Sequence, residues 1–121
     1  MKNLVRVLFL FISFTAFSQD PFLQNSNEMA EQEAKEITNK YIPELGLTGE
    51  QTLLFQQKVE EFLIRRNKIE AEYSGKEKLN FLFQLQLEET AEMGDILTRP
   101  QLQVYKKVKP QFQPLDKVEK Q

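Results

Sequence analysis

The sequence predicts an all-α protein with a small four-helix hairpin architecture. After residue 26, apolar residues recur mostly at spacings of three and four, as on the buried face of a helix. Two segments with the pattern Leu-Thr-x-x-Gln, residues 47–51 and 97–101, each precede such an apolar pattern. Only residues 79–87 alternate with the period of a strand, and a single strand has no partner with which to pair.

The first 18 residues have the organisation of a secretory signal peptide. Lys2 and Arg6 provide a positive region, and the mostly apolar run VLFLFISFTAF follows from residue 7 to residue 17. Ala16 and Ser18 then supply the small residues of a cleavage site before Gln19. A transmembrane anchor is the alternative, but the run is shorter than the roughly 20 residues that a spanning helix needs. The sequence therefore predicts export to the periplasm, with secretion outside the cell as the other destination.

The composition excludes several classes of function. The mature chain has about 100 residues and contains no cysteine, histidine or tryptophan. This removes the usual ligands of zinc, copper and haem and the nucleophile–histidine pairs of hydrolases. Loss of Lys2 and Arg6 takes the formal charge from −2 to −4, and the acidic and basic blocks that follow lack the basic footprint of a nucleic-acid-binding protein. We therefore expect no cofactor, no metal and no nucleic acid, and stability must come from helix packing or oligomerisation.

The first helix is predicted to begin at Asn27, after an irregular arm formed by residues 19–26. Asn27 fits an N-cap. Pro43 is expected to end this helix near Tyr41, because the residue before a proline avoids the α conformation. The predicted buried face carries Ala30, Ala34, Ile37 and Tyr41.

The segment LTGEQ, residues 47–51, has the pattern of a helix start. Thr48 lies at the expected N-cap, and Gln51 lies three residues later, as in a capping box. Arg66 interrupts the apolar seam of the helix that follows. Either its stem lies along the seam with the charged head in water, or its charge belongs to a binding or dimer surface. Gly75 is a candidate left-handed stop, and the seam consists of Phe55, Val59, Phe62, Ile69 and Tyr73.

Residues 76 to about 94 are predicted to form a helix despite the strand-like alternation within them. Leu, Gln and Glu are good helix formers, and the run continues into EETAEMGD. One face of such a helix is expected to fill the core, whereas the other needs a partner or stays exposed. The sequence leaves open which apolar residues belong to which face. Its expected grouping places Leu79, Leu82 and Phe83 opposite Phe81 and Leu85.

The segment LTRPQ, residues 97–101, repeats the helix start. Thr98 is the expected N-cap, and Gln101 closes a second capping box. Pro100 lies in the first turn, where its missing N–H is harmless. Leu97 and Leu102 fit a hydrophobic staple across this start.

The final helix is expected to stop before Pro110. Its apolar residues include Tyr105 and Val108. The helical domain is therefore predicted to cover residues 27–109, and residues 110–121 are predicted to form a flexible tail.

With two Leu-Thr-x-x-Gln elements, no cysteine and this helix order, the chain resembles the Spy/CpxP family of periplasmic LTxxQ-motif proteins. The matching residues are Leu47, Thr48 and Gln51, and Leu97, Thr98 and Gln101. The resemblance implies an elongated, cradle-shaped homodimer that acts as an ATP-independent chaperone or restrains envelope-stress signalling. Some relatives are linked to metal resistance. The chain departs from the family in being net acidic where family cradles are basic, and its lack of histidine and cysteine weakens a metal-binding role.

Two functions follow as hypotheses. The first is a holdase of the envelope stress response, a homodimer that binds unfolded or misfolded envelope proteins. The second is an interaction protein that docks onto an envelope stress sensor or another single partner. The candidate client or dimer surface consists of Arg65, Arg66, Lys68, Phe81, Leu82, Phe83 and Leu85.

Catalysis is not predicted. It would have to rely on paired carboxylates, which on helices usually face solvent as ordinary surface charges. No glycine-rich phosphate loop is present either. The pairs in question are Glu60 with Glu61, and Glu88 with Glu89 and Glu92.

Overall fold

Four α-helices make up the described part of the chain. A computed structural model describes residues 21–115, with side chains for residues 27–115. Between residues 21 and 115 there is no strand, which confirms the all-α prediction. The expected signal peptide, residues 1–18, lies outside the described residues. The helices are α2 (Pro21–Leu45), α3 (Gly49–Glu72), α4 (Gly75–Met93) and α5 (Arg99–Phe112).

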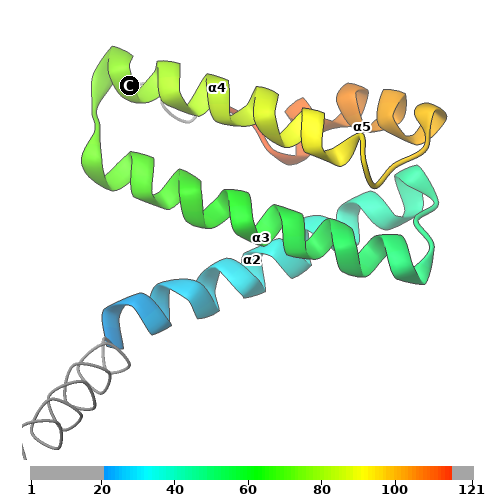
Figure 1. Ribbon diagram of the computed structural model, residues 1–121, viewed down its shortest axis with the longest axis horizontal. Helices are drawn as coiled ribbons and strands as arrows, with labels where there is room; N and C mark the ends of the chain where they lie inside the picture. Colours follow the sequence, from blue (N-terminus) through cyan, green and yellow to red (C-terminus); the bar gives the residue numbers. More distant parts are fainter. Residues whose placement is uncertain (1–20, 116–121) are drawn as a thin grey trace, which may run out of the picture.

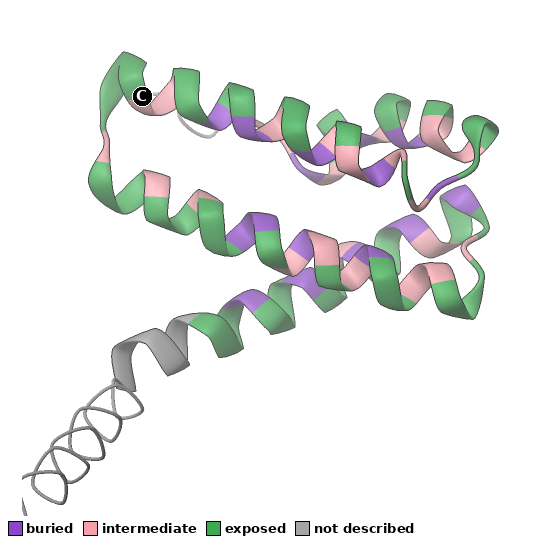
Figure 2. Ribbon diagram, in the orientation of Figure 1, coloured by how far each residue is buried: buried purple, intermediate pink, exposed green. Residues whose placement is uncertain are grey.

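The helices α3 and α4 form an antiparallel hairpin (Figure 1). The C-terminal half of α2 packs against α3, and α5 packs against α2. The start of α2 extends away from the other helices (Figure 1). Buried residues gather on the sides of the helices that face one another (Figure 2). None of the described helices is both long and apolar enough to cross a bilayer.

The helix α2 begins earlier than the sequence predicts. It starts at Pro21, so residues 21–26 are helical and the expected irregular arm is wrong for this segment. Proline suits the first helical position, because its φ is already helical and its missing N–H would have no partner there. Asn27 consequently lies inside the helix and does not cap it.

Two prolines lie inside helices rather than ending them. Pro43 and Pro110 occupy the last turns of α2 and α5, so the predicted helix ends near Tyr41 and before Pro110 are wrong. Each proline frees the carbonyl four residues earlier, and these carbonyls belong to Asn39 and Lys106, which are both exposed. Water can therefore bind the freed carbonyls, which lowers the cost of each proline.

The predicted flexible tail is wrong for residues 110–115. The helix α5 continues to Phe112, and the next residue, Gln113, is buried. The Gln113 N–H donates to the Lys109 carbonyl at 2.7 Å and closes the helix. Residues 116–121 lie outside the described part of the chain.

Glycines in the left-handed region close two of the helix junctions. Gly46, after α2, has a φ of 65°, and Gly75, after α3, has a φ of 61°. A side chain at either position would be strained, because only glycine adopts this conformation without a steric penalty. The prediction of a left-handed residue at Gly75 is confirmed.

The core is an aromatic cluster to which α2, α3 and α5 each contribute. The Tyr41 ring centroid lies 4.9 Å from that of Phe55 and 5.2 Å from that of Tyr105. Phe112 packs edge-on against Tyr41 at 5.0 Å. Such pairs contribute about 0.5–1.5 kcal/mol each beyond their buried area. The cluster therefore fixes the end of the molecule at which the two Leu-Thr-x-x-Gln segments lie.

Candidate functional site

Both Leu-Thr-x-x-Gln segments form capping boxes, as predicted. At α3, Thr48 Oγ1 accepts from the Gln51 N–H, and Gln51 Oε1 accepts from the Thr48 N–H, both at 3.1 Å. At α5, Thr98 Oγ1 and Gln101 Oε1 accept the equivalent bonds at 3.4 and 2.9 Å. Each box satisfies two N–H groups that have no intrahelical partner. The motif residues therefore start helices.

The two glutamines also bind each other, a contact that the sequence pattern does not predict. Gln51 Nε2 donates to Gln101 Oε1 at 2.8 Å, and Gln101 Nε2 donates to Gln51 Oε1 at 3.0 Å. Gln51 Nε2 also donates to the Ile96 carbonyl at 3.2 Å. Gln101 Nε2 donates to the Leu45 carbonyl, likewise at 3.2 Å. We call this reciprocal pair the glutamine clasp, and it joins the α2–α3 turn to the α4–α5 turn.

The leucines of the motifs anchor the clasp to the core. Leu97 is buried in the core cluster, and Leu47 packs against that cluster half-buried. Leu102 packs against it as well, which places both residues of the expected staple in one cluster. All six motif residues therefore contribute to helix starts, the clasp or the core.

The predicted client surface divides into buried and exposed residues. Leu82 is 1% exposed and Leu85 is 7% exposed. They lie three residues apart and share one face of α4, so the expected grouping on opposite sides is wrong and both are core residues. Phe81 and Phe83 are exposed. Phe81 packs against Tyr73 across the end of the hairpin, with ring centroids 4.5 Å apart.

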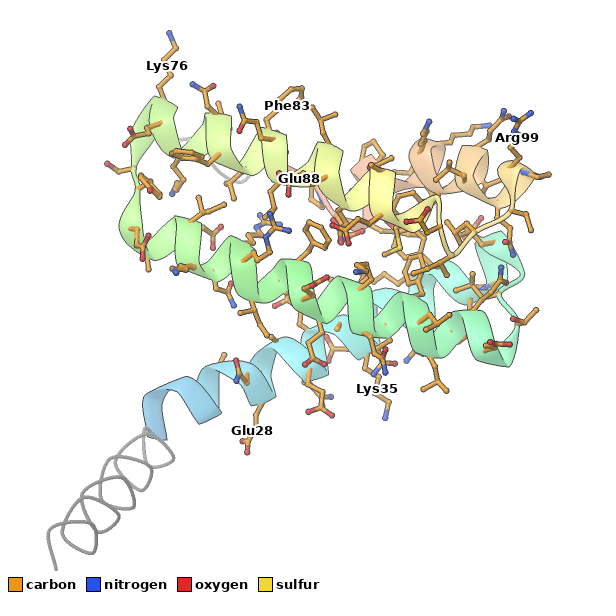
Figure 3. The ribbon with its side chains drawn as sticks, in the orientation of Figure 1. Glu28, Lys35, Lys76, Phe83, Glu88 and Arg99 are labelled. Atoms are coloured by element: carbon orange, nitrogen blue, oxygen red, sulfur yellow. The ribbon has the colours of Figure 1, made fainter. Side chains whose placement is uncertain are left out.

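The basic residues of the predicted surface are largely paired. Arg65 binds Glu88 across the hairpin, and Figure 3 shows Glu88 on the side of α4 that faces α3. Arg66 is half-buried and binds Glu70 at 3.4 Å. Lys68 is exposed. Because two of the three cations have carboxylate partners, exposed apolar side chains distinguish this hairpin more clearly than positive charge does.

An exposed apolar surface covers the outer side of α4. Phe83 is 55% exposed and Leu87 is 58% exposed, and a spacing of four residues places them on one face. Phe83 points away from α3 (Figure 3). Beside Leu87, an open groove between α4 and α5 is lined by Leu102, Lys106 and Pro110. We call Phe83, Leu87 and this groove the outer apolar face; other exposed apolar residues are Met29, Leu53, Leu54 and Ile64.

A buried ion pair joins α4 to α5. Lys109 Nζ donates to Glu89 Oε1 at 2.9 Å and to the Tyr105 hydroxyl at 3.0 Å. Desolvation lowers the pKa of Lys109, and the Glu89 carboxylate partly opposes that shift. Burial, together with the nearby Glu89 charge, raises the pKa of Tyr105. No motif in the sequence predicts this pair, although Lys109 lies four residues after Tyr105 and hence on the same helix face.

The acidic residues near the end of α4 are held by different cations. Within residues 27–115, no three histidine, cysteine or acidic side chains converge as metal ligands. The ion pairs are Glu88 with Arg65, Glu89 with Lys109, and Glu92 with Lys58.

Comparison with known proteins gives no assignment. No family model, no curated protein and no solved structure matches this chain.

Proposed function

We propose that this protein is an ATP-independent holdase that binds unfolded or misfolded envelope proteins. The observation that carries the proposal is the outer apolar face, where Phe83 and Leu87 are both more than half exposed and adjoin an apolar groove. Contiguous exposed apolar surface on a small protein commonly marks an interaction site. Lys106 at the groove edge adds a charge that can pair with acidic residues flanking an apolar client segment.

The size of this surface suits weak and reversible binding. Complete burial of an exposed Phe or Leu side chain is favourable by about 1.5–3 kcal/mol. Because Phe83 and Leu87 are 55% and 58% exposed, both together supply roughly 2–3 kcal/mol before the cost of ordering a client. An affinity of about 1 mM corresponds to about 4 kcal/mol. Several such contacts would retain an unfolded chain, while each one alone releases it. A client can therefore leave without ATP hydrolysis.

The proposal also places the protein in the Spy/CpxP-like class. It includes export through the signal peptide of residues 1–18 and the formation of a homodimer. The two capped Leu-Thr-x-x-Gln segments support the class. Exposed Leu53, Leu54 and Ile64 on α3 supply apolar surface that a second copy would cover. Sedimentation velocity of the chain from Gln19 onward tests the dimer. We expect twice the mass of one chain, and a single-chain mass at every concentration would contradict it.

Light scattering tests the holdase proposal. A chemically denatured, aggregation-prone protein is diluted into buffer with or without the chain from Gln19 onward, and no ATP is added. We expect scattering to fall at near-stoichiometric amounts of the chain. A folded, helical chain that leaves aggregation unchanged would contradict the holdase and favour a protein that docks onto a single envelope partner such as a stress sensor.

A further inference from the structure

The segment that follows α5 crosses the α3–α4 hairpin and is tied to two helices. Gln113 Oε1 accepts from the Tyr41 hydroxyl of α2 at 2.7 Å. Its backbone carbonyl accepts from Gln86 Nε2 of α4 at 3.4 Å. Pro114 and Leu115 follow and are half-buried. We call residues 113–115 the C-terminal strap.

The strap covers apolar residues of the hairpin. Leu115 lines a small cavity with apolar side chains from α3 and α4. The cavity has a volume of about 20 Å³, which is enough for one water molecule. Without the strap, this lining would be an open groove between α3 and α4, and its polar members are Arg66, Gln86 and Glu89. Its apolar members are Phe62 and Leu63 of α3 and Leu82 and Leu85 of α4.

One polar atom beneath the strap lacks a partner. Glu89 lines this cavity and is 5% exposed; its Oε1 binds Lys109, whereas its Oε2 accepts no hydrogen bond from the described residues. A buried carboxylate oxygen without a donor is unfavourable. Pro114 has no N–H to offer. The cavity has room for one water that can supply this donor, and a backbone N–H of an extended peptide can supply it as well.

We propose that the groove between α3 and α4 is a binding site for extended peptide segments and that the strap is its intramolecular occupant. A client segment that displaces the strap would place an apolar side chain where Leu115 lies. Its carbonyl would accept from Gln86 Nε2, and its N–H would donate to Glu89 Oε2. That the competing segment belongs to a client rests on the proposed holdase function. That the groove binds extended peptides does not depend on the holdase function.

The strap is suited to release because few contacts hold it. Among the described residues, two hydrogen bonds to other helices, the Leu115 side chain and the half-buried Pro114 beside Ile37 of α2 hold it in place. Its tether to α5 nevertheless keeps it near the groove at an effective concentration on the order of 1 mM. A free peptide must therefore compete with the strap, and weakening the strap should make the groove accessible.

The test compares two charge substitutions in the chain from Gln19 onward. Leu115→Asp places a carboxylate in a cavity lined by four apolar side chains and by Arg66, whereas Gln111→Asp adds the same charge at an exposed position in the last turn of α5. The probe is a fluorescently labelled peptide with the sequence of residues 111–121, and its anisotropy is measured. We expect the Leu115→Asp chain to bind the peptide at least about tenfold more tightly than the other two chains do. In the unchanged chain and in Gln111→Asp, the strap competes with the peptide for the groove.

Two controls keep the result interpretable. A peptide that itself carries Leu115→Asp should not bind any of the three chains. If Leu115→Asp loses its helical circular dichroism, then Leu115→Ala and Gln111→Ala replace the pair, since they remove the contact without adding charge. Equal binding by the two variants, or no binding by a folded Leu115 variant, would overturn the strap proposal.

The aggregation assay separates this proposal from the holdase. We expect that a lower concentration of the Leu115→Asp variant than of the unchanged chain gives the same suppression of client aggregation. If the peptide binds as expected but no chain suppresses aggregation, the holdase is contradicted and the peptide groove stands. If the unchanged chain suppresses aggregation but the peptide fails to bind a folded Leu115 variant, the strap proposal is overturned and the holdase stands.

Discussion

Gln51 and Gln101 lie fifty positions apart in the sequence and exchange two side-chain hydrogen bonds, at 2.8 and 3.0 Å. Each amide also closes the capping box of its own helix. One side chain therefore serves both a local helix start and a long-range contact between two turns. Because every donor of both amides is used, the loss of either glutamine leaves polar groups of the other unpaired.

Removal of one clasp glutamine should destabilise the protein. Gln51→Ala and Gln101→Ala are each expected to lower the free energy of unfolding by about 1–3 kcal/mol, because each leaves groups without partners. The double variant should cost less than the sum, with a coupling of about 0.5–3 kcal/mol. Urea unfolding followed by circular dichroism measures these values. Gln103→Ala, at an exposed position of α5, is the control, and additive effects of the clasp variants would contradict the clasp.

The threonine caps should contribute separately measurable stability. Thr48→Ala combined with Thr98→Ala is expected to lower the free energy of unfolding by about 1–4 kcal/mol, the value of two caps. Helix content should stay largely intact, since packing holds both helices. Thr→Ser at the same positions keeps both hydroxyls and serves as the control. An unchanged melting temperature for the double alanine variant would show that the caps do not stabilise the fold.

Helix starts could be predicted from the sequence because a capping box involves residues within four positions of each other. The clasp could not, because it depends on how two distant turns meet in space. The helix ends at Pro43 and Pro110 were mispredicted for a related reason. The cost of a proline depends on whether the carbonyl that it frees reaches water, and the local sequence does not show this.

The candidate surface was predictable only in part. Five apolar residues among positions 81–87 indicated that α4 has more apolar surface than one face can bury, and Phe81 and Phe83 are indeed exposed. Which residues point inward depends on the rotation of α4 against α3, and packing sets that rotation. Leu82 and Leu85 were therefore misassigned as candidates for the surface.

The buried ion pair gives a prediction of larger magnitude. Lys109→Met is expected to lower the free energy of unfolding by about 3–5 kcal/mol, because it leaves Glu89 buried without a counter-charge. Addition of Glu89→Gln should restore part of this loss, since the uncompensated charge is then gone. Lys107→Met, at an exposed position of the same helix, is the control. Equal stability of the Lys109 and Lys107 variants would show that the pair is not buried as described.

Stability should fall at alkaline pH. Burial, with a smaller effect of the Glu89 charge, raises the pKa of Tyr41 and of Tyr105 above the ordinary value of 10.0. Below pH 10 both tyrosines are neutral in the folded and the unfolded chain, so this contribution to the free energy of unfolding is fully present. Above pH 10 the unfolded chain ionises more readily than the folded chain, and the free energy of unfolding falls by about 1.4 kcal/mol per pH unit for each tyrosine. The lowered pKa of Lys109 acts in the opposite sense, because stability then rises with pH until the ordinary value of 10.5 is reached.

Ultraviolet absorbance of phenolate, measured beside far-ultraviolet circular dichroism, checks this prediction. A Tyr73→Phe background leaves Tyr41 and Tyr105 as the two tyrosines of the chain. We expect phenolate absorbance to rise together with the loss of helix signal above pH 10. Phenolate formation in a chain that keeps its full helix signal would contradict the burial of both hydroxyls.

The most direct test of the central claim is client aggregation measured with variants of the outer apolar face. Phe83→Ser combined with Leu87→Ser removes this face, and Asn80→Ser combined with Gln84→Ser changes exposed polar residues of the same helix. We predict that the apolar double variant stays helical but needs at least several-fold more protein for the same suppression of light scattering, because the two substitutions together remove roughly 2–3 kcal/mol of client contact. The polar variant should match the unchanged chain. Equal suppression by all three chains would contradict a client-binding role for the outer apolar face.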